Sequence, residues 1–499
     1  MLSFRDMCVK CLAGIILLLV SGQVAAQSLQ EAIAAAQDHY NRTLQQAEDF
    51  IKETDKAYAE YMKNPWKKVS LTKVEINPYA EFPKIKPEVF SPGDRSSRLQ
   101  LVQCDVTHIG GLNADPGRYM KLEYDSYENI EVRDVLVSFN GYDISMRFAE
   151  DCEIHIDNTS EEHLASVWMQ MSDSPYDLIL SDIVKIGKHL VLSDWSIVKY
   201  VEAFCDAVYD APEMHRESVM TQVYLLHRLG FRVCLAHDEY DNLYRLISSD
   251  ATLNGTKEIY QDGIPYTLIG DYDGIDLSPY FFDDHGEYPV SMAVNRNEHF
   301  YSEYSDTLSF VSEKYPEVAV SVPVNVALKK FYEEFPIYHT DGNPLTEFYY
   351  RAMAPMSGDI VETVYPVLAD VLNGKSYLEA LNMLLDFVQT AFKYEMDSDR
   401  WCKERFFFPG EIWYHDASDC DDKAILFSRL VRDILKLKVA LIFWPCHLSC
   451  AVNLDGHQEG FMFDVSGEKF VSCDPTMPEA CVGDVMEVLK DVKASLILL

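Results

Sequence analysis

The chain has 499 residues, of which 48% are hydrophobic and 12% aromatic, enough apolar side chains for packed cores in about two to four domains. Its 80 Asp and Glu residues against 43 Lys and Arg give a formal net charge of −37, which disfavours binding to nucleic acid or anionic lipid through phosphate contacts. Twelve cysteines are too few for a disulfide scaffold in so long a chain.

Residues 1–26 have the layout of a secretory signal peptide. Two basic residues precede an apolar run from Leu12 to Val20, and a small-residue cleavage site ends at Ala26. The run is too short to span a bilayer, and no other stretch is long and apolar enough, so we expect no transmembrane segment after cleavage. We therefore expect an exported protein, in the periplasm, in the cell envelope or outside the cell.

Two extended segments follow the signal peptide. Residues 27–66 place mostly apolar side chains at every third or fourth position, which predicts one amphipathic helix. Residues 67–97 are predicted to form an extended linker or pro-segment, because prolines recur at Pro78, Pro83, Pro87 and Pro92. We expect that these prolines keep residues 78–92 from adding a regular strand to a sheet.

Residues 98–157 are predicted to form a small β-rich unit. Asn140-Gly141 is a strong turn signal, and apolar residues alternate after it from Tyr142 to Phe148, which indicates a β-hairpin. Cys104 and Cys152 fall in this unit and are candidates for a disulfide.

The next two segments, 158–340 and 341–499, each contain a helix that runs into a strand. The first reads SVMTQVYLLHRLGFRVCLA from Ser218, and the second reads DDKAILFSRLVRDILKLKVALI from Asp421. Two readings fit this likeness: the chain holds two copies of one α/β unit, or both segments show an order common in α/β proteins. If they are copies, the first is degenerate in chemistry, because residues 211–222 contain no cysteine.

The stretch ASDCDDKA contains the first candidate catalytic residue. Ser418 or Asp419 is a good helix N-cap, so Cys420 falls in the first turn of a helix. Backbone N–H groups and the helix dipole favour a thiolate there, whereas the neighbouring aspartates raise the pKa of a thiol. A cationic partner is therefore needed.

That partner is predicted to be His447. The strand VALIFW leads to Pro445-Cys446-His447, and a second strand, KFVSC, leads to Asp474. If these strands are neighbours, His447 can reach the thiol and Asp474 can hold the imidazole, which is the arrangement of a nucleophile, a base and an orienting carboxylate. Singly, each residue is more often structural, and only the order and spacing of all three favour catalysis.

The motifs DCDDKAILFSRLVR, PCHLSCAV and FVSCDPT resemble the transglutaminase-like superfamily of papain-type cysteine enzymes. The resemblance is strongest to large secreted bacterial proteins with such a domain at the C-terminus, and it covers residues 375–485. It implies an α+β fold in which a helix carrying Cys420 packs on an antiparallel sheet carrying His447 and Asp474. It also implies that Cys420 is the nucleophile, His447 the general base and acid, and Asp474 the orienting residue.

The resemblance extends to the oxyanion site and has two departures. Trp413 and Tyr414 lie where such domains place an aromatic donor to the oxyanion, and either residue fits a core position equally well. Family members commonly have glycine where this chain has Cys446, before the histidine, and where it has Lys436, before the next strand. Both departures affect the expected backbone geometry of the site.

The remaining cysteines and acidic residues suggest no metal or other cofactor. Alternation along the strands turns Cys446 and Cys450 away from His447, which disfavours zinc. If His447 and Asp474 lie opposite each other, Cys446, Cys450 and Cys473 occupy diagonal positions too far apart for a disulfide, and we expect all three to be reduced and buried. The loop DYDGID, with Asp271, Asp273 and Asp276, lacks the closing glutamate of a calcium site.

We therefore expect an exported, cysteine-dependent acyl-transfer enzyme that acts on amide bonds of a peptide or protein substrate. Water as the acceptor makes it a peptidase or amidase, and an amine makes it a transglutaminase. The rival hypothesis is a catalytically silent envelope protein that uses the same fold to bind protein or glycan. We also expect the Cys420 thiol to be unpaired, partly exposed and the most reactive in the chain.

Overall fold

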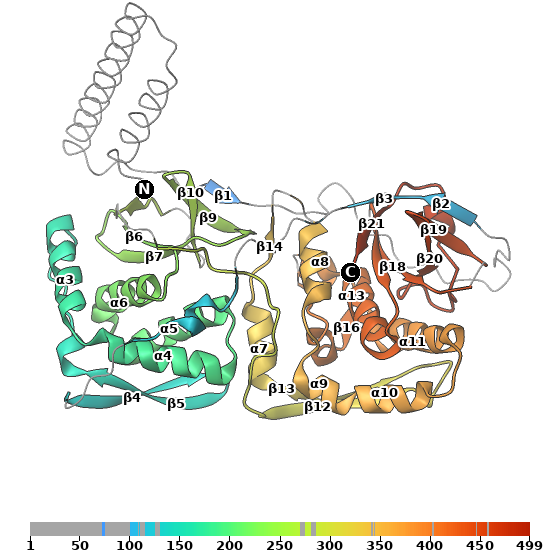
Figure 1. Ribbon diagram of the computed structural model, residues 1–499, viewed down its shortest axis with the longest axis horizontal. Coiled ribbons are helices and arrows are strands. Elements are labelled where there is room, and N and C mark those ends of the chain that lie inside the picture. Colours follow the sequence, from blue (N-terminus) through green and yellow to red (C-terminus); the bar gives the residue numbers. More distant parts are fainter. Residues whose placement is uncertain are drawn as a thin grey trace, which may run out of the picture. The chain divides into compact units, whose positions relative to one another are not determined.

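The computed structural model describes residues 72–74, 100–107, 109, 115–124, 130–269, 275–280, 286–340, 343, 345–401, 404–445, 447–456 and 459–499. The predicted signal peptide, the N-terminal helix and the four linker prolines lie outside these residues. The described residues form a mixed α+β fold, as the sequence predicts (Figure 1). Among their helices, none is long and apolar enough to cross a membrane.

The first half of the described chain begins with the predicted hairpin. Its strands are β4 (Val132–Phe139) and β5 (Tyr142–Ala149), which pair antiparallel in register. Asn140 and Gly141 join them with φ angles of 49° and 79°, the left-handed values that a tight hairpin turn requires. The prediction of this hairpin is confirmed.

Helices and a second set of strands follow the hairpin. The helices are α3 (Glu161–Asp173), α4 (Tyr176–Leu190), α5 (Asp194–Val208) and α6 (His215–Arg228). The strands are β6 (Val233–His237), β7 (Leu243–Ile247), β8 (Thr252–Leu253), β9 (Thr256–Gln261), β10 (Ile264–Leu268) and β11 (Ser278–Pro279).

The second half also begins with a hairpin, formed by β12 (Tyr304–Val311) and β13 (Ala319–Asn325). Its helices are α7 (Val326–Glu334), α8 (Leu345–Met353), α9 (Gly358–Thr363), α10 (Tyr365–Leu372), α11 (Tyr377–Ala391), α12 (Asp397–Arg400) and α13 (Cys420–Leu430). Its other strands are β14 (Tyr338–His339), β15 (Lys393–Tyr394), β16 (Ala417–Ser418), β17 (Val439–Trp444), β18 (His447–Asn453), β19 (Phe461–Val465), β20 (Glu468–Cys473) and β21 (Ser495–Leu498).

The two halves share a core order of elements, in which a hairpin precedes two packed helices and the strands of a sheet, although the second half has further elements between them. One sheet has the strand order β1-β9-β10-β7-β6-β11, and the other has β2-β19-β20-β18-β17-β21-β3. In each half, a long helix (α6 or α13) packs on the central strands that directly follow it, and an earlier helix (α5 or α11) packs beside it (Figure 1). The central strands β6–β7 and β17–β18 are both antiparallel hairpins.

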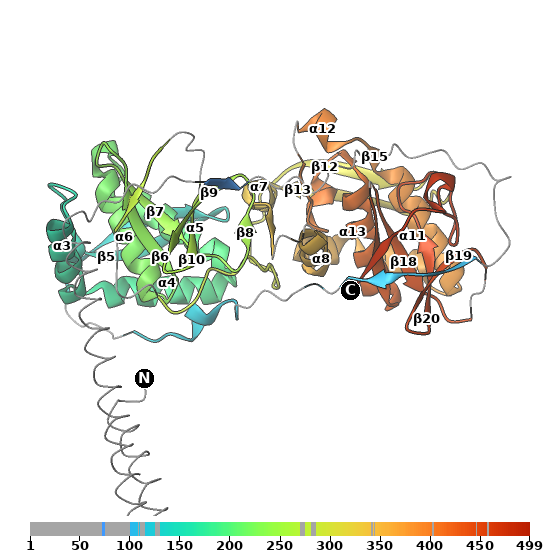
Figure 2. The ribbon, with the colours of Figure 1, turned by 90° about the horizontal axis from the view of Figure 1, so that it is seen from above.

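Residues from the N-terminal part of the chain complete both sheets. β1 (Thr72–Val74), within the segment predicted as a linker, pairs with β9; it precedes the first linker proline. β2 (Gln100–Gln103) pairs parallel with β19 and β3 (Asp105–Val106) pairs parallel with β21, so one short segment joins the two outer strands of the second sheet (Figure 2). This segment closes the second sheet into a ring, which the local sequence pattern did not predict.

The second sheet has an apolar core on each face. Leu441 and Cys450 belong to the large core that includes α13, whereas Ala440, Ile442 and Ala451 belong to a separate core inside the ring. Strict alternation along β17 and β18 produces these two faces. Burial of one face holds the sheet against α13, and burial of the other face forms the core inside the ring. Each fully buried Leu or Ile contributes roughly 1.5–3 kcal/mol.

The connection between α13 and β17 is strained at one residue. α13 continues into a π-helical turn at Val431–Leu435, and Lys436 follows with a φ of 57°. Gly230 stands at the same place in the first half, three residues before β6, with a φ of 90°. The structure thus places Lys436 in the left-handed region, which glycine adopts at less cost than lysine.

Candidate functional site around Cys420, His447 and Asp474

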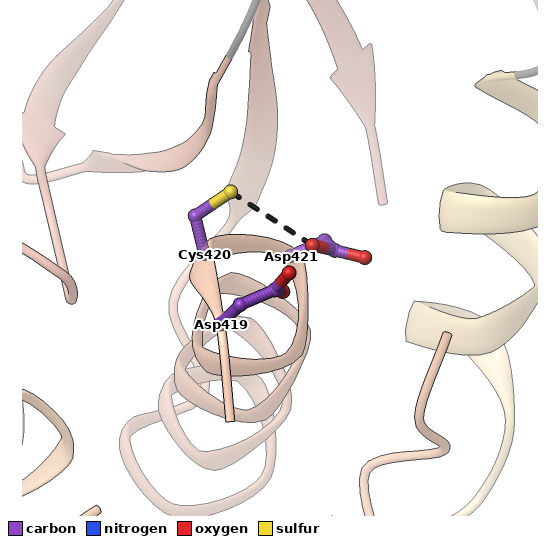
Figure 3. A group of neighbouring side chains, drawn as sticks. All are labelled: Asp419, Cys420 and Asp421. Carbon is purple, nitrogen blue, oxygen red and sulfur yellow. Dashed lines mark hydrogen bonds between the residues drawn. The ribbon is translucent and has the colours of Figure 1, made fainter. Parts of the chain in front are cut away.

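Cys420 is the first residue of α13, as predicted. Asp419 is the N-cap, and its backbone N–H donates to Asp422 Oδ2 at 3.2 Å, which closes the first turn. The Cys420 thiol donates to Asp421 Oδ1 at 3.8 Å (Figure 3). The helix N-terminus and a carboxylate therefore both lie at the sulfur.

The carboxylates around this turn are held by backbone donors. Oxygen atoms of Asp397, Asp419 and Asp422 lie within 4.8 Å of one another. The backbone N–H of Phe407 donates to Asp422 Oδ1 at 3.0 Å, and that of Arg405 donates to Asp397 Oδ2 at 2.7 Å. These bonds hold the carboxylates of Asp422 and Asp397 in place beside the start of α13.

The expectation that Cys420 is partly exposed is wrong: its exposed fraction is 0%. His447 and Asp474 are also buried, at 1% and 2% exposed. Cys420, the residues of the turn before α13 and the first strand residues of β18 all pack against neighbouring core elements. The thiol of Cys420 is therefore closed to solvent in this structure.

His447 and Asp474 are in contact. His447 opens β18, Asp474 follows β20, and Nε2 of the imidazole lies 2.9 Å from Asp474 Oδ2. The other carboxylate oxygen, Oδ1, accepts the Thr476 hydroxyl at 2.7 Å and the Thr476 backbone N–H at 3.0 Å. Both oxygens are thus oriented by specific donors.

The ionisation of Asp474 follows from these contacts. Burial alone would raise its pKa, but the imidazole and the donors of Thr476 outweigh burial and hold the pKa of Asp474 below its usual value. An ionised carboxylate can only accept, so Nε2 of His447 carries the proton in this contact. In the neutral form of the ring the lone pair then lies on Nδ1, which is buried with no hydrogen-bond partner among the described residues, Cys420 Sγ included.

The register of the two strands differs from the expected one. Cys450 pairs directly with Cys473 and Ala451 with Ser472, so continuing the register places His447 opposite Thr476, two residues beyond Asp474. A shift of two residues leaves every side chain on its own face, which is why the alternation could not reveal it. The contact between His447 and Asp474 forms across this offset.

Cys450 and Cys473 are nevertheless free thiols, as expected, and both are fully buried. The Cys450 thiol donates to the carbonyl of Ala424 on α13 at 3.2 Å. Burial raises the pKa of both thiols. Cys152 is also a free thiol, so it forms no disulfide with Cys104, for which the two residues were candidates, and Cys446 lies outside the described residues.

The two aromatic candidates for the oxyanion site differ in their surroundings. The Tyr414 hydroxyl donates to Asp359 Oδ2 at 2.5 Å, which directs it to α9. Trp413 is fully buried against Phe310, Phe387 and Phe392, and within the described chain its indole Nε1 has no hydrogen-bond partner. Of the two, only Trp413 keeps a donor that no described group uses.

Two buried polar residues next to the site, Gln389 and Lys423, were not predicted from the sequence. Gln389, near the end of α11, donates from Nε2 to the carbonyl of Asp474 at 2.8 Å. Lys423, one turn after Cys420, is 1% exposed and donates to the carbonyls of Gln389 and Phe392 at 3.0 and 2.6 Å. A lysine inside an otherwise apolar helix face was the available signal.

Of the residues weighed as metal ligands, Cys450 and Cys473 lie opposite each other on β18 and β20. Cys450 points to α13, on the face opposite the ring core, and does not join His447. Asp271 and Asp273 of the acidic loop fall in a stretch that the structure leaves undescribed, whereas Asp276 is described.

No family model matches the chain, and no curated protein or solved structure matches it either. The arrangement supplies a thiol at a helix start, an imidazole with one available nitrogen, and an ionised carboxylate that fixes the ring. A set of this chemistry carries out nucleophilic attack on a carbonyl, with proton transfer to the leaving group, once the thiol and the imidazole meet; in the described structure His447 Nδ1 makes no hydrogen bond to Cys420 Sγ.

Proposed function

We propose that the protein is an exported cysteine-dependent acyl-transfer enzyme that acts on amide bonds of peptides or proteins. The observation that carries the proposal is the contact between His447 Nε2 and Asp474 Oδ2, which leaves Nδ1 of a buried imidazole unpartnered within the described chain. Cys420 supplies the nucleophile from the first turn of α13, the helix that packs on β18. A papain-like or transglutaminase-like fold for the second half is part of this proposal.

The proposed reaction has two stages. The thiol attacks the amide carbonyl and loses its proton to His447 Nδ1, and the imidazolium then gives that proton to the leaving amine, which leaves a thioester. Water or a second amine attacks the thioester, with His447 again taking the proton. Trp413 Nε1 is the better of the two proposed oxyanion donors because the Tyr414 hydroxyl is already bonded to Asp359.

The common element order supports a related proposal, that the first half is a silent copy of the second. If β6 is aligned with β17 at Val233 and Val439, their partner residues are Ile247 and Val452. Five residues before these partners stand Asn242 and His447. The helix α6 begins at His215, where α13 begins at Cys420. The first half thus lacks the cysteine and the histidine of the second.

Burial of Cys420 keeps the rival function, a silent binding protein of the envelope, as a second candidate. A thiol that stays closed to substrate serves no acyl transfer. The two functions differ in what the thiol does: only the enzyme must open and must activate Cys420.

The test is labelling with iodoacetamide at about pH 6, followed by mass-spectrometric mapping, with Cys420→Ala and Cys481→Ala as matched variants. The enzyme hypothesis expects the fastest modification at Cys420, unchanged by removal of the more exposed Cys481. It also expects amide hydrolysis or amine incorporation on peptide libraries, lost only in Cys420→Ala. Modification of Cys420 no faster than that of buried Cys450, with no turnover, would favour the binding protein.

A further inference from the structure

Lys423 is a buried cation in the midst of the proposed catalytic residues. It lies three residues after Cys420 on α13, and side chains three apart on a helix are neighbours. Its ammonium donates to two carbonyls at the end of α11, those of Gln389 and Phe392. Carbonyls at a helix C-terminus lack partners within the helix, and the negative end of the helix dipole favours a cation there.

The charged and titratable groups that face Lys423 come from several elements around it. Burial lowers the pKa of its ammonium, and the charges of Asp474, in the turn after β20, and of Asp419 and Asp422, at the start of α13, oppose this effect. The ring of Tyr394, on β15, has its centroid 6.0 Å from the ammonium. The end of α11 contributes carbonyls. Lys423 is thus a cation to which three of the site's carboxylates are electrostatically coupled.

Lys423 is also linked indirectly to Asp474, through two hydrogen bonds of Gln389. The backbone carbonyl of Gln389 accepts a hydrogen bond from the ammonium of Lys423. The side-chain Nε2 of Gln389 donates to the carbonyls of Asp474 and Ala480. The end of α11 therefore joins the helix that carries Cys420 to the turn that carries Asp474. Movement of either side alone would break one of these bonds.

The first half of the chain provides an internal comparison. Ser218 is the fourth residue of α6, as Lys423 is of α13, and Asp206 is the thirteenth residue of α5, as Gln389 is of α11. The Ser218 hydroxyl donates to Asp206 Oδ1 at 2.9 Å. The first half, which lacks the cysteine and the histidine, thus connects the two equivalent helices, α5 and α6, without a lysine.

We propose that Lys423 is a positioning residue of the Cys420 site, whose buried ammonium offsets the carboxylates beside the thiol and holds the Asp474 turn in register with α13. The proposal rests on the proposed function. The tie between helices is common to both halves, so what Lys423 adds is positive charge. That charge favours the thiolate of Cys420, which the neighbouring aspartates disfavour.

The test measures the rate of Cys420 modification by iodoacetamide from pH 5 to pH 9.5 in the full chain. Lys423→Met removes the charge, Lys423→Gln keeps a donor without the charge, and Lys423→Arg keeps the charge. Lys438→Met is the matched control, because Lys438 pairs with Glu468 on the surface of the same half.

We expect the Met and Gln variants to react on the order of 3- to 10-fold more slowly at pH 5.5, because loss of a neighbouring cation moves thiolate formation to higher pH. Their rates should converge with the wild-type rate near pH 9. The Lys438→Met variant should follow the wild type at every pH, and the Arg variant should follow it at pH 5.5, where the charge of Lys423 is present. A purely structural role would lower the rate by the same factor at every pH.

Three outcomes would overturn the inference: profiles of both neutral variants that superimpose on the wild type, a uniform loss at all pH values, or failure of all three Lys423 variants to fold. A wild type in which Cys420 reacts slowly at every pH would instead count against the proposed function itself. The two failures are therefore distinguishable by the wild-type profile alone.

Discussion

The two carboxylate oxygens of Asp474 bind different partners. These contacts determine how much each residue of the proposed site is expected to contribute to activity. Oδ2 meets the imidazole while Oδ1 is occupied by Thr476, so the carboxylate cannot rotate away without losing two donors. An asparagine in its place can keep the shape but presents an N–H to one of these partners.

We therefore expect Asp474→Asn to lower kcat/KM by roughly 10- to 10⁴-fold and Cys420→Ala to abolish turnover, with folding intact in both. An orienting residue contributes less than the nucleophile because the thiol can still react at a misaligned imidazole. Steady-state kinetics on any substrate found by library screening measures the order. Equal, complete loss in both variants would contradict it.

Lys423 predicts a dependence of stability on pH. Burial lowers the pKa of its ammonium from 10.5 to about 7, against the opposing effect of Asp474, Asp419 and Asp422. Between about pH 7 and about pH 10.5 the unfolded chain holds a proton that the folded chain has partly released, so the stability of the fold rises with pH in this window.

Replacing Lys423 with Met removes this slope. We expect the free energy of unfolding of the wild type, relative to Lys423→Met, to increase from pH 7 to pH 10 in urea titrations. Lys438→Met should leave the slope in place. Parallel curves for wild type and Lys423→Met would show that the ammonium keeps its ordinary pKa in the fold.

The candidate residues Cys420, His447 and Asp474 could be predicted from their order along the chain and from their places at element ends. Lys423 and Gln389 could not, because their partners are backbone carbonyls that only the packing of α11 on α13 brings near. Exposure of Cys420 was predicted wrongly for the same reason: the burial of a helix start depends on the segments that pack over it, which local sequence does not specify.

At the scale of elements, the residue three positions before each central hairpin, Gly230 or Lys436, has a left-handed backbone conformation that substitutions can test. Gly230 has a φ of 90°, and a Cβ built there would lie 2.6 Å from the ring of Tyr288. Lys436 has a φ of 57° at the equivalent place, a conformation that costs an L-residue roughly 1–2 kcal/mol.

We expect Gly230→Ala to destabilise the fold by roughly 2–3 kcal/mol, since it adds both backbone strain and a clash. Lys436→Gly should do the opposite and stabilise by up to about 1 kcal/mol, because the strain relieved exceeds the added flexibility of the unfolded chain. Chemical denaturation of the two variants decides. A stabilised Gly230→Ala would contradict the expected strain.

The types of these elements followed from periodicity and turn residues, as the hairpin at Asn140-Gly141 and the helix after Cys420 illustrate. The register of β18 on β20 did not, since sliding by two residues keeps Cys450, Cys473 and their neighbours on the same faces. Packing of the Cys450 thiol on the carbonyl of Ala424 is one contact that distinguishes the observed register from its neighbours.

At the scale of the whole molecule, the second sheet depends on residues that precede the first half. β2 and β3 together occupy only Gln100–Val106, yet they pair with β19 and β21 at the two ends of the strand order. Cys104 lies between them and its thiol donates to the carbonyl of Ala494. Sequence periodicity describes neighbours along the chain, so pairing across nearly 400 residues lies beyond it.

This closure makes the effect of truncation depend sharply on where the chain begins. A chain starting at residue 98 keeps β2 and β3 and loses β1, which pairs with β9 through three residues. A chain starting at residue 108 loses both pairings and exposes the edges of β19 and β21, which are templates for association. It also lacks Cys104 and Val106, whose packing against the core inside the ring contributes about 2–4 kcal/mol.

We therefore expect the chain from residue 98 to fold as a soluble protein, and the chain from residue 108 to unfold at lower temperature and to aggregate. Thermal unfolding and size-exclusion chromatography compare the two, and activity of the longer one bears on the predicted N-terminal helix. Activity above that of the full chain supports an inhibitory pro-region, and equal activity supports a spacer. If the chain from residue 108 is as stable as the chain from residue 98, the segment Gln100–Val106 contributes nothing to the ring, and its pairing is incidental to the fold.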